Sequence, residues 1–172
     1  CSVATPCNSV GVWSPSHRTG DMRAAVYYGP NKVAVEDVAV PDPGPGTVQL
    51  QVGFNGICGT DLHEYYAGPI FVPTQPHPLT HQELPLTLGH EFSGTITAVG
   101  AGVTGWREGD RVAVEPIYKC GHCGPCAAGN YNVCQQIGFH GLMSDGGMAE
   151  YTVMPTNMLH RLPDNVSLEL GA

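Results

Sequence analysis

The sequence lacks the features that would place it in a membrane or on a nucleic acid. Its 172 residues contain no apolar run close to the roughly 18 residues that a membrane-spanning helix needs. Basic residues are scarce, because 7 Lys and Arg stand against 15 Asp and Glu for a net charge of −8. We therefore expect no membrane and no nucleic-acid partner. Residues 1–21 also lack the apolar core of a signal peptide, which favours a cytoplasmic, reducing compartment.

Glycine and proline, in contrast, are abundant, with 23 and 15 residues. This amount of turn chemistry argues against a helical bundle and favours a loop-rich β fold. Short β-branched or alternating runs predict strands over residues 22–28, 32–40, 48–54, 92–99, 111–114 and 148–154. A proline-punctuated loop is expected over residues 77–88. Together these patterns predict a mainly β protein, either a small antiparallel barrel or a sandwich.

The character of the sequence changes at Met22. Residues 1–21 combine small polar residues with two prolines and show no periodicity, so we expect a disordered extension or an artefact of cloning or reading frame. Residues 22–172 show no internal repeat and are interpreted as one domain.

Four of the seven cysteines gather in one segment. Cys120, Cys123 and Cys126 are each separated by two residues, and Cys134 follows after seven more. Four thiolates can surround a tetrahedral zinc ion, so we predict a structural zinc with no open position. An iron–sulfur cluster, disulfides or free thiols are the alternatives, although ferredoxin spacing differs and a reducing compartment disfavours disulfides. His122 lies in this loop but is not needed, because four thiolates complete the shell.

A second set of candidate ligands is dispersed along the chain. Cys58 follows a predicted strand, and His90 and Glu91 lie about thirty residues later. Cysteine, histidine and carboxylate are all zinc ligands, and a catalytic zinc uses three of them with one position open. These residues alone are a weak signal, since a single cysteine is most often a small buried hydrophobe.

The surrounding motifs strengthen this signal. The segment Gly89–Val103 reads GHExxGx5Gx2V, the segment CGTDLHEY begins at Cys58, and GDRV and GGxAEY follow at Gly109 and Gly146. In combination with the four-cysteine loop, residues 22–172 resemble the GroES-like catalytic domain of the zinc-containing medium-chain alcohol and polyol dehydrogenases. Segments such as CGTDLHEY and LGHEFSG look most like the 2,3-butanediol (acetoin-forming) branch. The resemblance implies a small GroES-like β-barrel that carries a loop-bound structural zinc.

The resemblance also implies roles for individual residues. Cys58 and His90 resemble the two main ligands of the catalytic zinc, and Glu91 resembles the third ligand, bound directly or through water. Neighbouring residues on a strand face opposite ways, so His90 and Glu91 can share one metal only if the chain bends, which Gly89 permits. Thr60 resembles the hydroxyl that takes the proton of the substrate alcohol.

The remaining candidate residues are His63, Asp61 and the other histidines. His63 resembles the next member of the proton relay, for which an imidazole is suited, although an ordinary exposed histidine is the alternative. Asp61 is interpreted as a carboxylate that stabilises a turn. The remaining histidines carry no motif and are expected in loops or at the surface, with His140 a candidate for the substrate cleft: His77, His81, His140 and His160.

The segment Gly100–Gly105 satisfies G-x-G-x-x-G but is not interpreted as a dinucleotide site, because a strand and not a helix is predicted after it. We therefore expect no cofactor-binding residues here and no Rossmann domain before residue 172. NAD or NADP, a small alcohol or diol substrate and homo-oligomer formation are implied for the intact enzyme, and this chain alone is expected to be a fragment without turnover. The alternatives are a GroES-like module that keeps only structural zinc, and a redox or metal sensor that uses exposed thiols.

Overall fold

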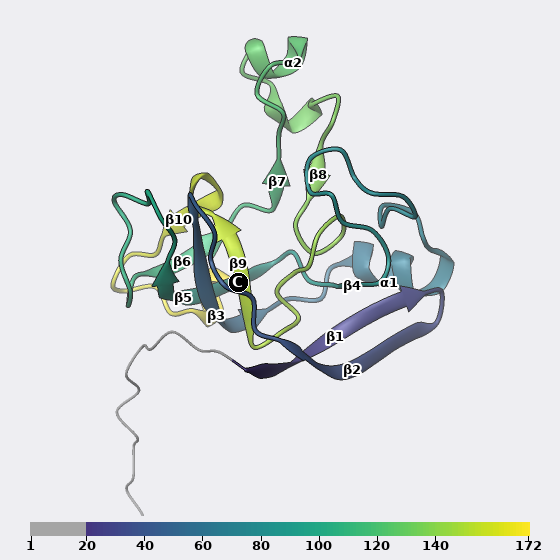
Figure 1. Cartoon of the computed structure of the whole chain (residues 1–172), viewed down its shortest axis with the longest axis horizontal. Helices are drawn as coiled ribbons and strands as arrows, with labels where there is room; N and C mark the ends of the chain where they lie inside the picture. The colour runs from purple at the N-terminus through teal and green to yellow at the C-terminus, as the bar shows by residue number, and fades with distance from the viewer. Residues whose placement is uncertain (1–19) are drawn as a thin grey trace, which may run out of the picture.

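The computed structural model describes residues 20–172, which are built mainly of β-strands (Figure 1). The longer elements are β1 (Asp21–Gly29), β2 (Lys32–Ala39), β3 (Thr47–Asn55), α1 (Gly59–Ala67), β5 (Phe92–Val99), β6 (Arg111–Val114) and β9 (Tyr151–Pro155). The shorter ones are β4 (Leu86–Thr87), β7 (Ile117–Tyr118), α2 (Gly124–Ala127), β8 (Gly138–Phe139), β10 (Leu159–Arg161) and 3₁₀ turns at Tyr131–Val133, Thr156–Met158 and Glu169–Gly171. None of the helices in this part of the chain has the length and apolar character to cross a membrane. The mainly β class expected from the sequence is confirmed.

The expected extension over residues 1–21 lies almost wholly outside the described residues. Asp21 already belongs to β1, where it pairs with Ala39 of β2. The first element therefore begins one residue before the Met22 boundary.

The larger sheet has the strand order β10-β6-β5-β3-β9, and all of its neighbouring pairs are antiparallel. It encloses the main core, formed by Val48, Leu50, Phe92, Ile96, Val112, Met154, Met158 and Leu159. The alternating pattern predicted that β3 is half-buried, but Gln49 is as fully buried as its apolar neighbours. Its side-chain amide donates to the carbonyl of Pro41 (3.0 Å) and accepts from the hydroxyl of Thr97 (2.7 Å). The prediction is wrong for this part of β3, because the segment before the strand covers its second face.

The smaller sheet, β2-β1-β4, supports the only long helix in the described residues. β1 and β2 form a hairpin whose turn places Asn31 at a positive φ of 59°. Tyr27 of β1 is fully buried, and its hydroxyl donates to the carbonyl of Glu64 in α1 (2.7 Å). This contact ties the middle of α1, the helix that follows Cys58, to the smaller sheet.

Two segments differ from the strands expected from the sequence. The loop predicted over residues 77–88 contains β4, which pairs with β1. The strand predicted over residues 148–154 begins only at Tyr151. Before that point the chain follows the other sheet, because Ala25 donates to the carbonyl of Met148 (2.8 Å) and Ala149 forms an isolated bridge with Ala24. The segment thus passes from the smaller sheet to the larger one. The alternation of apolar and polar residues within the segment gives no indication of this change of partner.

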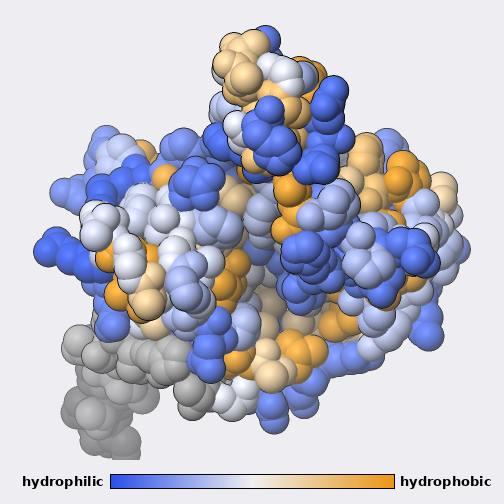
Figure 2. All heavy atoms as spheres, turned by 45° about the horizontal axis from the view of Figure 1, so that its top comes forward, coloured by the Kyte–Doolittle hydropathy of each residue, from blue (hydrophilic) through white to orange (hydrophobic). Residues whose placement is uncertain are grey.

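The four cysteines lie in a separate lobe. β7 and β8 pair as a short antiparallel stalk, and α2 lies at its far end (Figure 1). In the space-filling view the lobe stands clear of the two sheets (Figure 2). So small a lobe buries little apolar surface of its own, and a bound metal is a common means of stabilising such a structure.

Candidate metal centres

The four-cysteine cluster, formed by Cys120, Cys123, Cys126 and Cys134, has the geometry of a tetrahedral site. All four Sγ atoms lie within 4.8 Å of one another. The Sγ atoms of Cys120 and Cys126 are 4.0 Å apart, and those of Cys123 and Cys134 are 3.9 Å apart. Four thiolates at about 2.3 Å from one zinc ion stand about 3.8 Å apart, whereas a disulfide requires about 2.0 Å. The observed separations fit four ligands around one cation and exclude disulfides within the cluster.

Backbone N–H groups face these sulfur atoms. The amide of Cys120 donates to Sγ of Cys134 (3.3 Å), and the amide of Cys123 donates to Sγ of Cys120 (3.4 Å). The pKa of Cys123 is lowered to about 6, chiefly by the backbone N–H of Gln135, whereas burial together with the neighbouring Cys123 raises the pKa of Cys126 to about 12. The values diverge because one thiolate disfavours a second beside it. A cation among the four sulfur atoms would favour the ionised form of all four.

The loop that holds the cluster is formed by local turns. Gly121 has a φ of +78°, a conformation that favours glycine, and α2 begins directly after Cys123. His122 is exposed, and its Nδ1 lies 2.9 Å from the carbonyl of Cys120. It is not among the four clustered ligands, as the sequence analysis expected.

The second group, here called the Cys58 site, consists of Cys58, His90 and Glu91. Ligand atoms of these three residues lie within 4.8 Å of one another, although about thirty residues separate the first from the others. Cys58 is the N-cap of α1, and its amide donates to a carboxylate oxygen of Asp61 (2.9 Å). Hydrogen bonds from the backbone and the hydroxyl of Thr60 lower the pKa of the Cys58 thiol. The helix start therefore favours the thiolate that a metal requires.

The chain bends before β5, so that His90 and Glu91 can both face Cys58. Gly89 has a φ of +104°, and a Cβ atom there would lie 2.6 Å from the side chain of Asn55 and from the amide of Met148. The carbonyl of Glu91 accepts from the amide of Gly56 (2.7 Å), which joins the two loops of the site. β5 begins only at Phe92, so strand alternation does not apply to the two ligands. The bend that the sequence analysis required is present.

Asp61 has a role that the sequence analysis missed. Its Oδ1 lies 3.5 Å from Nδ1 of His90, an ion-pair contact, and the two buried atoms have no partner other than each other. Asp61 raises the pKa of His90 to about 9. An imidazole oriented by a carboxylate at one nitrogen is typical of a metal ligand, since the other nitrogen is then available to the metal. The sequence shows only that Asp61 follows a candidate ligand by three residues, and its burial and its contact with His90 come from the fold.

The two relay candidates lie on α1 at different exposures. The hydroxyl of Thr60 is 3.6 Å from Sγ of Cys58, at the edge of the Cys58 site. His63 is exposed one helical turn further along, on the same face of α1 as Thr60. The structure thus brings Thr60 to the ligands and leaves His63 facing solvent.

The structure places two of the other histidines in the interior. His81 and His160 are exposed, whereas His77 and His140, the candidate for the substrate cleft, lie in segments between the named elements, as expected, but are buried. Nε2 of His77 lies 3.1 Å from the carbonyl of Ile137, and His140 belongs to a network of hydroxyl groups. These contacts come from distant segments, which the sequence pattern does not show.

The G-x-G-x-x-G segment lies in the turn between β5 and its antiparallel neighbour β6. Gly100 is required by packing, because a Cβ atom there would lie 1.8 Å from the carbonyl oxygen of Gly44. Among the described residues, no helix follows this segment before β6. The glycine is therefore explained by close contact between two backbone segments.

Comparison with known proteins identifies relatives. Residues 44–164 match the alcohol dehydrogenase GroES-like domain family. The chain is 46% identical to (R,R)-butanediol dehydrogenase of Bacillus subtilis over 154 residues, which cover 88% of this chain and 43% of that protein. It therefore spans less than half the length of this relative. A crystal structure of 2R,3R-butanediol dehydrogenase from the same species superposes with a TM-score of 0.81 at 45% identity, covering 87% and 43% of the two chains.

Two other similar solved structures contain a cofactor or metal ions. A short chain alcohol dehydrogenase from Escherichia coli, complexed with NADH, has a TM-score of 0.76 at 36% identity and covers 88% of this chain and 41% of its own. A cobalt and zinc bound alcohol dehydrogenase from Pyrobaculum aerophilum has a TM-score of 0.73 at 29% identity, with coverages of 87% and 43%. With the family match over most of its length, the chain belongs to the alcohol dehydrogenase GroES-like domain family.

Proposed function

We propose that the chain binds one structural zinc ion in the four-cysteine cluster and one catalytic zinc ion in the Cys58 site. The observation that carries the proposal is the convergence of Cys58, His90 and Glu91 within 4.8 Å in a chain of this family. Three protein ligands leave one position open, which distinguishes a catalytic zinc from the closed four-thiolate shell. The domain formed by residues 22–172 would then be the zinc-bearing catalytic domain of a dehydrogenase.

The residues present fit a zinc ion. The Cys58 site offers a thiolate, an imidazole and a carboxylate, all of which are zinc ligands. Asp61 lies beside Nδ1 of His90, so Nε2 is the nitrogen that would bind the metal. Asp61 is therefore a positioning residue that holds the tautomer and the orientation of the ring.

The proposed reaction is the oxidation of a small secondary alcohol or vicinal diol to the ketone, with hydride transfer to NAD or NADP. When bound, zinc supplies Lewis acidity that lowers the pKa of an alcohol hydroxyl. The Thr60 hydroxyl, 3.6 Å from Sγ of Cys58, can accept the substrate proton as it donates its own. His63, exposed on the next turn of α1, passes that proton to solvent.

The relatives support the substrate and the cofactor of the proposal. Butanediol dehydrogenase from Bacillus subtilis acts, by its name, on a vicinal diol, and the Escherichia coli structure contains NADH. A reducing cytoplasm agrees with the free state of the five cysteines in residues 20–172, four of which the structural zinc would use. The resemblance also implies that the intact enzyme forms a homo-oligomer.

Metal analysis tests the two sites separately. Protein purified under reducing conditions should contain two zinc ions per chain, and Cys58→Ser should contain one. Cys123→Ser should lose the structural zinc and much of its folding stability, because a closed site contributes its binding energy to the fold. Cys7→Ser, at a cysteine outside the described residues and outside both motifs, is the matched control and should keep two. Iron, or folded protein without metal, would contradict the structural assignment.

A chimera tests the reaction. Residues 22–172 would replace the equivalent part of the Bacillus subtilis enzyme, with which this chain shares 46% identity. The chimera should oxidise 2,3-butanediol with NAD and reduce acetoin, and its Cys58→Ser variant should lose both activities while remaining folded. A strong preference for primary alcohols, with diols inert, would contradict the proposed substrate. Activity that survives Cys58→Ser would contradict the proposed site.

A further inference from the structure

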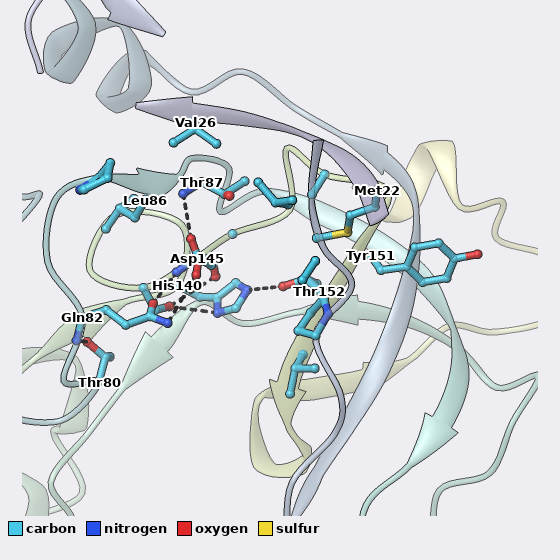
Figure 3. A pocket seen from close by; sticks show the side chains of 18 of the residues that line it. Met22, Val26, Thr80, Gln82, Leu86, Thr87, His140, Asp145, Tyr151 and Thr152 are labelled. Atoms are coloured by element: carbon cyan, nitrogen blue, oxygen red, sulfur yellow. Dashed lines mark hydrogen bonds between the residues drawn. The ribbon is translucent and has the colours of Figure 1, made fainter. Parts of the chain in front are cut away.

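A cavity lies away from the two metal centres, between the smaller sheet and β9. Its volume is about 590 Å³, within the range of pockets that hold small organic molecules. β1 and β4 contribute Val26 and Leu86, the segment after β8 contributes His140, and β9 contributes Thr152 (Figure 3). Ser144, in the same segment as His140, also lines the cavity. None of the Cys58 site residues lines it. The cavity is therefore distinct from the site of the proposed reaction.

Hydroxyl groups surround His140 along one wall of this cavity. Nε2 of His140 lies 3.0 Å from Oγ1 of Thr152. On its other side, Nδ1 lies 2.9 Å from the hydroxyl of Tyr118 and 3.1 Å from Oγ of Ser144. We name these four residues the His140 network. It joins β7, the segment after β8, and β9.

The His140 network can present either a donor or an acceptor to a ligand. Burial lowers the pKa of His140 to about 3, so the ring is neutral at physiological pH. With the proton on Nε2, the ring donates to Thr152, and the hydroxyl hydrogen of Thr152 is then available to a ligand. With the proton on Nδ1, Thr152 donates to the ring and its oxygen can accept instead. A hydroxyl group, which both donates and accepts, is matched by either arrangement.

The charges at the cavity select against anions. Its lining includes the carboxylates of Glu36 and Asp145 and, among the described residues, no Lys or Arg. Both carboxylates already have partners: Glu36 accepts from the hydroxyl of Tyr28 (2.7 Å), and Asp145 accepts from the amide of Thr87 (2.8 Å; Figure 3). Because both carboxylates already accept hydrogen bonds, we expect them to attract a cationic ligand only weakly. The neighbouring walls are apolar, as at Val26 and Leu86.

We propose that this cavity binds a neutral, ring-bearing alcohol or phenol. The ring would lie against Val26 and Leu86, and the hydroxyl would bond to the His140 network. A ring system is favoured because it would remove more of the apolar lining from water than a short diol can in a cavity of about 590 Å³. The inference does not depend on the proposed zinc chemistry.

Three probes of similar shape test the ligand class. 2-Naphthol is neutral at pH 7, 2-naphthoate is an anion and 2-naphthylmethylamine is a cation, and the binding of each to the full chain can be followed by calorimetry and by NMR. We expect saturable binding of 2-naphthol, with shifts at Ser144 and Thr152, and at least tenfold weaker binding of the two ions. Equal binding of the anion, tighter binding of the cation, or no saturable binding of 2-naphthol would each overturn the proposal.

Matched variants test the location. Ala39 is exposed at the cavity, so Ala39→Phe should block entry without disturbing the core, whereas Ala101→Phe, on the exposed turn after β5, should leave binding unchanged. Thr152→Val should weaken 2-naphthol binding by about two- to twelvefold, because it removes the hydroxyl that bonds to the ligand, whereas the exposed Thr104→Val should leave binding unchanged. Cys58→Ser should bind 2-naphthol as tightly as the unmodified chain does. Full affinity in Ala39→Phe, or loss in Cys58→Ser, would place the ligand elsewhere and refute the proposal.

Discussion

Acid should destabilise this protein through His140. The side chain is 2% exposed, and burial lowers its pKa to about 3, against an ordinary value of about 6.5 in the unfolded chain. Tyr118, whose hydroxyl lies 2.9 Å from His140, is neutral in acid because its ordinary pKa is about 10, and burial raises this pKa further. The folded state therefore keeps His140 neutral at pH values where the unfolded state binds a proton.

The sign and the size of the effect follow from this difference. A histidine with a depressed pKa contributes its full stability above pH 6.5, and this contribution falls as the pH is lowered toward the folded value of about 3. Each pH unit in that window costs about 1.4 kcal/mol. Between pH 7 and pH 5, the protonation of unfolded His140 should lower the free energy of unfolding by about 2 kcal/mol.

Urea unfolding of the unmodified chain and of His140→Gln at both pH values measures the effect. Glutamine does not titrate, so the stability difference between the two chains isolates His140 from metal loss, which affects both. The advantage of the unmodified chain should shrink by about 2 kcal/mol on going from pH 7 to pH 5. A difference that stays constant over this range would refute the buried, neutral state of His140.

Three substitutions test the packing. Leu50→Ala should lower the free energy of unfolding by about 2–5 kcal/mol in urea, because Leu50 is fully buried, whereas Leu170→Ala, 78% exposed, should change it by less than about 0.5 kcal/mol. Gly100→Ala should lower the melting temperature, because its Cβ would strike the carbonyl of Gly44, whereas Gly44→Ala meets open space and should melt normally. Glu64→Gln should cost about 1–3 kcal/mol by thermal unfolding, because the buried carboxylate accepts backbone N–H groups from residues 70–72 and an amide can satisfy fewer of them.

Local features of the fold could be predicted from the sequence. The predicted strand over residues 92–99 coincides with β5, and that over 111–114 coincides with β6, because their β-branched runs and flanking turns are contained in short windows. The four-cysteine cluster was equally local, since its spacing alone brings the sulfur atoms together. The burial of Gln49 was not predictable in this way, because it depends on Pro41 and Thr97 in other segments.

In the candidate site, too, some features could be predicted from the sequence and others depend on contacts between distant segments. Cys58, His90 and Glu91 were selected by resemblance, and their proximity depends on the bend at Gly89 and on the start of α1. Asp61 was interpreted as a turn carboxylate because its turn is visible in the sequence. Its contact with His90 spans 29 positions and exists only in the fold.

Anomalous diffraction at the zinc absorption edge, from crystals of the chain grown under reducing conditions, tests directly whether the chain binds zinc at both sites. Two zinc peaks are expected. One should lie among the four Sγ atoms of the four-cysteine cluster, and the other should lie between Sγ of Cys58, Nε2 of His90 and a carboxylate oxygen of Glu91. A single peak at the four-cysteine cluster, with Cys58, His90 and Glu91 ordered and without metal, would contradict this expectation.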